Sequence, residues 1–534
     1  MLLLVILVCF PAAAQQDHPV LRLLIFGSDA QPIRTDKPEG VDDAAVPALA
    51  TPAARLVTAA FLGRPLDDAL LAEIRNRLDS YYAAIARPFV SIETPDQDVD
   101  DGTLRVNVIE MKTGRVRVEG NHWFDDQQYL SAIRLRPGDP VNTNTLAEDT
   151  SWINRGGHQH ATIAVEPGVD PSTYDLAVRA EDSRPLDVTL AADNTGTADG
   201  TGLYRIGLAA DWSNALWRGD DLNYVFRTSP DQFRLLQNTL SYTAYLPWRD
   251  WVTISAENSL KWAPRTGPLP DLSTTGDANI ISFRYGMALP SSSDFMQHID
   301  AGYDFKSTNS NVLTGGSSVF PTTSELDQFV LAYTFRRNDT SALTGATVEL
   351  VGSPGHLTPG NTAAALGAQQ PGASPSYVYG RLSAERLTSL PFETAWRAMI
   401  TAQYSSDKLL ESEQLQFGGV QSIRGFEEFA ATRDEGVLMQ NELRLAALKP
   451  GLFAGQTDTE ALVPFVFLDL GAGRNHLDLA GVQHSWLEMV SAGPGLTWQF
   501  APNIALRLSW GLPIIRNGHT GPLLGPQFGT QITF

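Results

Sequence analysis

The chain has 534 residues and a formal net charge of −21 at pH 7. Such acidity argues against a nucleic-acid-binding protein, which would carry basic patches. Cys9 is the only cysteine, so the sequence excludes a disulfide framework and a metal site built on several cysteine thiolates.

Residues 1–14 have the pattern of a secretory signal peptide. An apolar run is followed by small residues that end at Ala14, although the usual positively charged start is missing. The run is shorter than the roughly 20 residues that a membrane-spanning helix requires. We therefore expect cleavage after Ala14. No later stretch is long and apolar enough for such a helix, so a membrane location would have to come from strands.

Residues 20–112 are predicted to form a small α+β unit with the order strand, two helices, two strands. In the second helix, Leu71, Ile74, Leu78 and Tyr81 recur at three- and four-residue spacing, which predicts the buried face. The elements expected from the pattern are strands at Val20–Gly27, Phe89–Glu93 and Thr103–Ile109 and helices within Ala53–Ala84, broken near Gly63.

Residues 113–183 repeat this order. The expected elements are strands at Arg115–Val118, Ala161–Glu166 and Tyr174–Arg179 and helices at Asp126–Ile133 and Thr145–Asn154. His158 and His160 lie in this unit. Without further ligands nearby in the sequence, we expect both to be solvated rather than metal-bound.

From Arg184 onward, helical spacing gives way to alternating segments of about ten residues, as expected of membrane barrel strands. Residues 295–306 show the pattern: Phe295, Ile299, Ala301, Tyr303 and Phe305 share one face, and polar residues occupy the other. Sixteen segments are expected, beginning near residues 186, 204, 221, 236, 251, 279, 296, 327, 345, 376, 394, 434, 462, 486, 502 and 526.

Connection lengths favour a barrel over a soluble β-sandwich. Short turns follow alternate strands, at residues 246–250, 289–294, 390–394 and 500–503. The other connections are long and rich in Gly, Ser, Thr and Pro: residues 263–278, 306–325, 353–375 and 475–484, with one long turn on the opposite side at 449–460. Outer-membrane barrels have this asymmetry, with the long loops outside.

One of the long connections contains the segment Gln416–Phe426, Q-F-G-G-V-Q-S-I-R-G-F. Gly418 and Gly419 permit backbone conformations closed to other residues, and Gly425 allows a tight turn behind Arg424. The arginine presents five donors in a rigid fork that fits a carboxylate.

A matching carboxylate lies in the segment Phe467-Leu-Asp469-Leu-Gly471. If the opposite face of this strand meets lipid, Asp469 points into the lumen, where Arg424 could reach it. Glu442 is a second, weaker candidate for the same network. A solvated ion pair contributes only about 0–1 kcal/mol, and the loop shows little apolar anchorage. We therefore expect the pair to fix the position of the loop rather than to stabilise the fold.

These two motifs resemble the V-R-G-F/Y tip of the sixth extracellular loop and the F-x-D-x-G strand of two-partner-secretion transporters, the haemolysin secretion/activation family. Both α+β units are similar to the periplasmic POTRA domains of that family. The resemblance implies a mainly β fold, with POTRA domains at 20–112 and 113–183 and a transmembrane antiparallel barrel of about 16 strands at 184–534. The sixth loop, around 406–433, would fold inward, and its functional residues would be Gly418, Gly419, Arg424, Gly425, Phe426, Phe467, Asp469 and Gly471.

The function implied by the resemblance is secretion of a large exoprotein, of haemolysin or adhesin type, across the outer membrane. The POTRA domains would act as its receptor. The alternative from the same superfamily is an insertase that assembles outer-membrane proteins. The terminal Phe534 resembles the signal that barrel-assembly machinery recognises, with Phe528, Thr530 and Ile532 on its face.

Other classes of function find no support in the sequence. No phosphate-binding loop, zinc-protease motif or nucleophile elbow is present. We expect no catalytic, cofactor or metal site, no nucleic-acid partner, and a monomer surrounded by outer-membrane lipid. A passive porin would lack the two α+β units.

Overall fold

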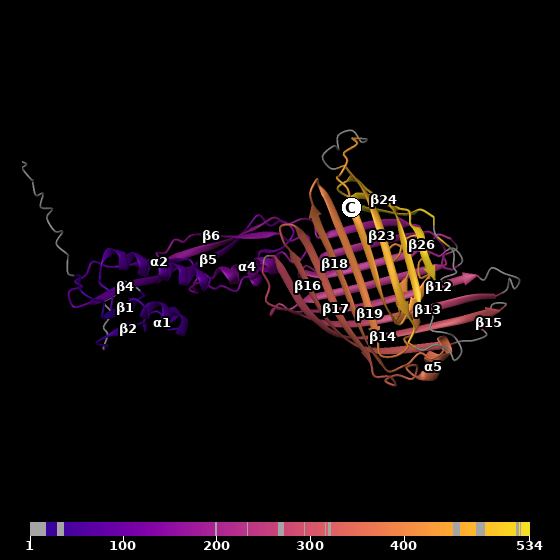
Figure 1. Ribbon diagram of the computed structural model, residues 1–534, viewed down its shortest axis with the longest axis horizontal. Helices are drawn as coiled ribbons and strands as arrows, with labels where there is room; N and C mark the ends of the chain where they lie inside the picture. Colours follow the sequence, from indigo (N-terminus) through magenta and orange to yellow (C-terminus); the bar gives the residue numbers. More distant parts are fainter. Residues whose placement is uncertain are drawn as a thin grey trace, which may run out of the picture. The chain divides into compact units, whose positions relative to one another are not determined.

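The computed structural model describes residues 18–28, 37–197, 200–231, 233–264, 272–292, 294–314, 317–318, 322–451, 460–476, 486–518, 523 and 525–534. It divides into two compact units (Figure 1). Unit 1 comprises most residues up to Glu181, and unit 2 comprises His122–Phe124, Arg155–Gln159 and Asp182–Phe534. The predicted signal peptide and its cleavage site after Ala14 lie outside the described residues.

Unit 1 begins with a four-stranded sheet in the order β2-β1-β4-β3. Strand β1 is parallel to β2 and β4, and β3 is antiparallel to β4. Two helices pack their apolar faces on it. The elements are β1 (Leu23–Gly27), β2 (Gly40–Asp42), α1 (Pro52–Ala59), α2 (Asp68–Ala84), β3 (Val90–Glu93) and β4 (Thr103–Glu110), with a 3-10 turn η1 (Pro47–Leu49).

The buried face of α2 differs slightly from the predicted one. Ile74 and Leu78 are buried as expected, but Leu70 and Tyr82 complete the face, whereas Leu71 and Tyr81 lie at its margin. Tyr82 reaches through the core to donate a hydrogen bond to Glu110 at 3.1 Å. A tyrosine can be buried when its hydroxyl has a hydrogen-bond partner. Which of Tyr81 and Tyr82 is buried therefore depends on tertiary contacts that the sequence pattern does not show.

A second, three-stranded sheet follows in the order β5-β7-β6, with β5 parallel and β6 antiparallel to β7. Tyr129, Leu146 and Val178 are among its buried apolar side chains. Its elements are β5 (Lys112–Glu119), α3 (Asp126–Ala132), α4 (Thr143–Ile153), β6 (Ala161–Pro167) and β7 (Thr173–Ala180). The capped helices start where the sequence offers Asp125 and Asn142 as N-caps.

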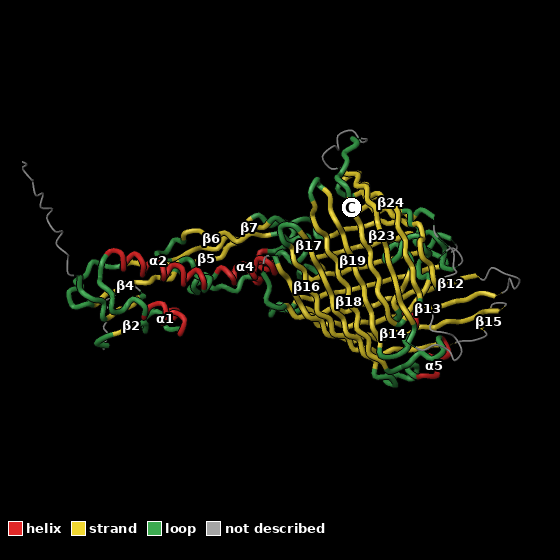
Figure 2. The backbone as a smooth tube through the Cα atoms, viewed as in Figure 1, coloured by secondary structure: helices red, strands yellow, loops and turns green. Residues whose placement is uncertain are grey.

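Unit 2 is a closed antiparallel barrel, visible in Figure 2 as adjacent yellow strands. It has sixteen strands when β25 and β26 are taken as one bent strand and the two-residue β15 is set aside. This confirms the predicted fold class. The strands are β8 (Leu186–Asp193), β9 (Arg205–Ala215), β10 (Asp220–Thr228), β11 (Leu235–Tyr245), β12 (Trp251–Pro264), β13 (Leu272–Ala288), β14 (Phe295–Thr314), β15 (Ser317–Ser318), β16 (Thr322–Asn338), β17 (Ala342–Ser353), β18 (Tyr377–Leu390), β19 (Thr394–Ser405), β22 (Glu435–Arg444), β23 (Ala461–Arg474), β24 (Leu487–Ala501), β25 (Ile504–Ser509), β26 (Leu512–Asn517) and β27 (Gln527–Thr533).

The inside and outside of the barrel follow the alternation of the sequence. On β16, Phe329 and Leu331 are about half exposed on the outer face, while Gln328 is fully buried on the inner face. The ring closes where β27 pairs with β8, so no strand edge of this ring is left open there. Among the described residues, no helix is long and apolar enough to cross a membrane.

Two of the predicted outer loops are largely strand. Residues 272–278 and 306–314 belong to β13 and β14, which pair in register as far as Leu272 and Thr314. Their Ser- and Thr-rich composition suggested a loop, but threonine favours strands when a neighbouring strand supplies the hydrogen bonds. The predicted loops around 475–484 and 449–460 lie mostly outside the described residues. The loop at 353–375 is as expected but contains a short helix, α5 (Ala363–Gln369).

Candidate functional site

The connection between β19 and β22, here called loop 6, carries the arginine segment. It contains the 3-10 turn η2 (Glu411–Glu413) and a small hairpin of β20 (Leu415–Phe417) and β21 (Ala431–Arg433). At the tip, Gly418, Gly419 and Gly425 have φ angles of +100°, +93° and +87°. Side-chain-bearing residues rarely adopt such angles, so these glycines allow the tight path of the tip.

Loop 6 has an apolar seat, which the sequence did not suggest. Ile423 and Phe426 of the tip are fully buried, together with Leu415 and Phe417 of the hairpin. They pack against inward-facing side chains of the barrel wall: Leu438, Leu487 and Met489. The expectation of little apolar anchorage is therefore wrong, because the wall lining at this place is apolar rather than polar.

Arg424 and Asp469 meet inside the barrel. The Nε atom of the arginine lies 2.7 Å from Oδ2 of Asp469, and its Nη2 atom lies 2.6 Å from Oδ1. The backbone N–H of Arg424 donates a third hydrogen bond to the same carboxylate at 3.0 Å. The fork of the guanidinium thus matches the carboxylate in a bidentate pair, the strongest common geometry for such a contact.

The position of the F-L-D-L-G segment in β23 explains the spacing of its three key residues. Phe467, Asp469 and Gly471 all face inward. The ring of Phe467 lies under the guanidinium, with its centroid 3.7 Å from Cζ of Arg424. A Cβ atom at Gly471 would lie 3.0 Å from Phe417 and would clash with Ile423. The three positions therefore stack the arginine, pair its charge and leave room for the loop.

Glu442 on β22 is a full member of this network. It accepts a hydrogen bond from Nη1 of Arg424 at 2.7 Å and another from Arg507. Arg444 lies 3.3 Å away, and Arg397 at 4.0 Å. One carboxylate thus contacts several guanidinium groups, so Glu442 is more central to the network than the sequence predicted.

The Arg424–Asp469 pair is buried, not solvated as expected. The side chains of Arg424 and Asp469 are 2% and 0% exposed. Removing one partner of a buried pair leaves an uncompensated charge, which costs about 3–5 kcal/mol. The contact can therefore hold the loop far more firmly than a surface ion pair.

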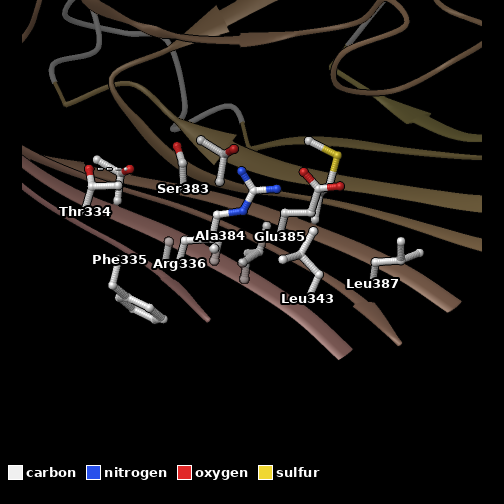
Figure 3. A pocket seen from close by; sticks show the side chains of 14 residues that line it. Thr334, Phe335, Arg336, Leu343, Ser383, Ala384, Glu385 and Leu387 are labelled. Carbon is white, nitrogen blue, oxygen red and sulfur yellow. Dashed lines mark hydrogen bonds between the residues drawn. The ribbon is translucent and has the colours of Figure 1, made fainter. Parts of the chain in front are cut away.

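An open recess of about 570 Å³ lines the inner wall across β16, β17, β18 and β19 (Figure 3). Figure 3 shows Thr334 and Ser383 on one side of the strands and Phe335 on the other. Ser383 and Thr401 also line a second recess, beside loop 6, of about 340 Å³. The inner wall next to the loop thus has a hollow that presents some polar side chains, in addition to the apolar seat.

The remaining candidates lie elsewhere. Phe534 follows the last strand, with its backbone hydrogen-bonded to Val188 and its side chain 58% exposed. His158 is not solvated as expected, since its Nδ1 atom lies 3.0 Å from Ser183 and its Nε2 atom 3.3 Å from Asp187. Among the described residues, no group of three or more His, Cys, Asp or Glu side chains could hold a metal ion.

Comparison with known proteins decides the family. Residues 173–497 match the family model described as haemolysin secretion/activation protein ShlB/FhaC/HecB. The chain belongs to this haemolysin secretion/activation family. The match covers more than half of the chain and includes both motifs of the lumenal network, so the predicted resemblance is confirmed.

Relatives of this family are similar along most of the chain. The heme/hemopexin transporter protein HuxB of Haemophilus influenzae is 21% identical over 477 residues, 86% of this chain and 80% of that protein. The outer membrane transporter CdiB of Escherichia coli is 24% identical over 375 residues, 65% of this chain and 58% of that protein.

Two solved structures have folds similar to that of this chain. CdiB from Escherichia coli has a TM-score of 0.75 at 16% identity, covering 99% of this chain and 93% of that chain. CdiB from Acinetobacter baumannii reaches 0.70 at 13% identity, covering 98% of this chain and 91% of that chain. This family member is accordingly an outer-membrane transporter, with its POTRA domains in the periplasm.

Two residues of the site had no signal in the sequence. Gly511 lies between β25 and β26 and contacts the loop tip, and Glu413 lies buried in η2. Gly511 stands in an apolar segment without a recognisable motif, and Glu413 stands in the polar run E-S-E-Q. Only the three-dimensional contacts distinguish either of them from its neighbours.

Proposed function

We propose that this protein secretes a large partner exoprotein across the outer membrane through its barrel, with loop 6 controlling the passage. The observation that carries the proposal is the buried Arg424–Asp469–Glu442 network, which holds the loop inside the barrel. Burying three charges inside a barrel carries a desolvation cost. A barrel without a transport function would gain nothing from a loop that is held in its lumen at this cost.

The recess beside loop 6 supports a path for an unfolded client. Ser383, Thr401 and Gln414 offer hydroxyl and amide groups along it. An extended chain presents backbone N–H and C=O groups that need partners wherever water is scarce. Hydroxyl and amide side chains can serve these groups without selecting a sequence. Because loop 6 lies inside the barrel, passage of a long client also requires the loop to move aside.

The three-stranded sheet of unit 1 is proposed as the receptor for the client. Among the described residues, its order, β5-β7-β6, leaves one side of β6 without a paired strand in this sheet, whereas the outer side of β5 is bridged at Lys112 by Pro140. An extended client segment can add a strand to such an edge, where main-chain hydrogen bonds give affinity with little sequence selectivity. This property suits a receptor for an unfolded exoprotein.

Further proposals concern the chain as a whole. We assign residues 1–14 to the signal peptide, 20–112 and 113–183 to the POTRA domains and 184–534 to the barrel. Phe534 would act as the recognition signal for barrel-assembly machinery. The protein would work as a monomer in outer-membrane lipid and carry out no enzymatic chemistry.

Co-expression tests this function. The protein would be produced in an Escherichia coli outer membrane together with each large secreted protein encoded beside its gene. We expect one of these exoproteins to reach the medium only when the transporter is present. Equal retention in the periplasm with and without the transporter, for every such exoprotein, would contradict the proposal.

A further inference from the structure

We propose that Glu413 and Lys306 form a second clamp of loop 6, which holds the stem of the loop across the lumen and keeps the barrel closed. This inference concerns a residue pair outside the arginine network. It does not rest on the identity of any exoprotein, because a closed lumen can be observed in the isolated transporter.

Glu413 is surrounded by partners from the barrel wall. Its side chain is 1% exposed, and its two oxygens lie 2.9 and 3.0 Å from Nζ of Lys306. Gln328 donates a hydrogen bond to it at 2.8 Å, and the hydroxyl of Tyr379 lies 3.1 Å away. The carboxylate is thus paired with a cation and also hydrogen-bonded, which a buried charge requires.

The strand order shows how far the stem must reach. Loop 6 leaves the wall at β19, whereas Lys306 lies on β14, four strands away in the order β14-β16-β17-β18-β19. Neighbouring strands are about 4.8 Å apart, so these two positions are separated by roughly 19 Å along the wall. A lysine side chain cannot cover this distance, so the stem itself leaves β19 and enters the interior.

Other contacts hold the backbone of the stem at the same place. Arg381 and Gln403, from β18 and β19, donate hydrogen bonds to the carbonyl of Glu413 at 3.2 and 3.0 Å. The carbonyl and the carboxylate of this single residue are therefore held by side chains of β14, β16, β18 and β19.

The two clamps use different sections of the barrel. Arg424 is held by β22 and β23 through Glu442 and Asp469, whereas Glu413 is held by β14, β16, β18 and β19. The two sets share no residue. Loop 6 is consequently fixed at two separate points, and releasing one of them leaves the other in place.

Breaking the second clamp has a defined physical consequence. Without Lys306, the charge of Glu413 is buried without the cation that pairs with it, and without Glu413 the ammonium group of Lys306 loses this ion pair. Movement of the stem into water relieves this cost. Ser412 and Gln414 of the stem line the recess of about 340 Å³ beside the wall, so this movement widens an existing opening.

Ion conductance of the purified protein in planar lipid bilayers tests the clamp. Glu413→Gln and Lys306→Met each remove one charge with little change in size, and the double variant removes both. The matched control is Glu411→Gln, the same substitution in the same 3-10 turn at an exposed side chain. Heat-modifiability on gels reports that each barrel has folded.

We expect each single variant to raise the mean conductance at least threefold over the wild type and Glu411→Gln to leave it unchanged. The double variant, which also lacks the clamp, should conduct no more than the more conductive single variant, because residues in contact act non-additively. Folded single variants that conduct like Glu411→Gln would overturn the proposal. Failure of both single variants to fold would also overturn it, since the pair would then hold the barrel rather than the loop. A transporter that conducts as expected but secretes no exoprotein would contradict only the proposed function.

Discussion

Gly425 and Gly511 touch each other through their backbones. A Cβ atom on Gly425 would lie 2.5 Å from the carbonyl oxygen of Gly511, and one on Gly511 would lie 2.5 Å from the backbone nitrogen of Gly425. Gly511 occupies the bend between β25 and β26, where pairing with β24 shifts from one segment to the next. The tip of loop 6 is therefore seated on the bend of a strand, where neither side has room for a methyl group.

This contact predicts that Gly511→Ala displaces the tip of loop 6. Overpacking of a tight contact costs about 1–3 kcal/mol, enough to weaken the seat of the loop but not to unfold a closed barrel. We expect secretion to fall several-fold, with normal heat-modifiability. Gly345→Ala is the control, since a Cβ atom there would come no closer than 3.8 Å to its nearest neighbour. Equal secretion by both variants would contradict the role of the bend.

Gly471 makes a second prediction, at the F-L-D-L-G strand. A methyl group at this position enters the space of Ile423 and approaches Phe417, so Gly471→Ala should impair secretion. The double variant Gly471→Ala/Ile423→Ala removes the obstructing side chain and should restore part of the loss. A secretion assay on the single and double variants checks this, and the absence of any restoration would show that the glycine serves another purpose.

Glu442→Gln should impair secretion about as much as loss of Asp469. The substitution leaves Arg424, Arg444 and Arg507 close together without the carboxylate that they share, and like charges in a partly dry lumen repel one another. The measurement is exoprotein in the medium, with Glu385→Gln as the control because that carboxylate is 47% exposed and pairs only with Arg397 among the ion pairs described. Equal effects of the two variants would contradict a special role of Glu442.

Deletion of residues 114–183, the second POTRA-like unit, is expected to abolish secretion while the barrel still inserts. The barrel closes through its own strand pairing, which involves none of β5, β6 and β7. Immunodetection of the heat-modifiable barrel in outer-membrane fractions, together with the secretion assay, checks both parts. Secretion at the wild-type level would show that this unit is not the receptor.

The sequence predicted the barrel well because alternation is local. A strand with one face in lipid and one in the lumen must repeat every two residues, and stretches such as residues 295–306 show this without any knowledge of their neighbours. The helices of unit 1 were predicted equally well, since their apolar spacing is also a local feature. Strand ends were predicted less well: β13 and β14 continue into Ser- and Thr-rich sequence because each supplies hydrogen bonds to the other.

The site could be predicted only in part. Arg424 and Asp469 stand out because their motifs are short and rich in glycine, whereas the burial of the pair depends on Phe417, Ile423 and Phe426, whose seat is formed by β22 and β24. Glu413 lies more than a hundred residues from Lys306, and nothing local in either segment points to the other. Long-range ion pairs of this kind become visible only when the barrel has closed.

The central claim is that Arg424 and Asp469 act as one unit to hold loop 6 inside the barrel. A double-mutant cycle tests it most directly, with exoprotein in the medium measured for Arg424→Ala, Asp469→Ala and the double variant, all as heat-modifiable barrels in the outer membrane. Because the pair is buried, each single loss forfeits about 3–5 kcal/mol of positioning. Both single variants should therefore lose most of their secretion, and the double variant should be no worse than either. Strictly additive defects would contradict the account, because they would mean that the two residues act independently.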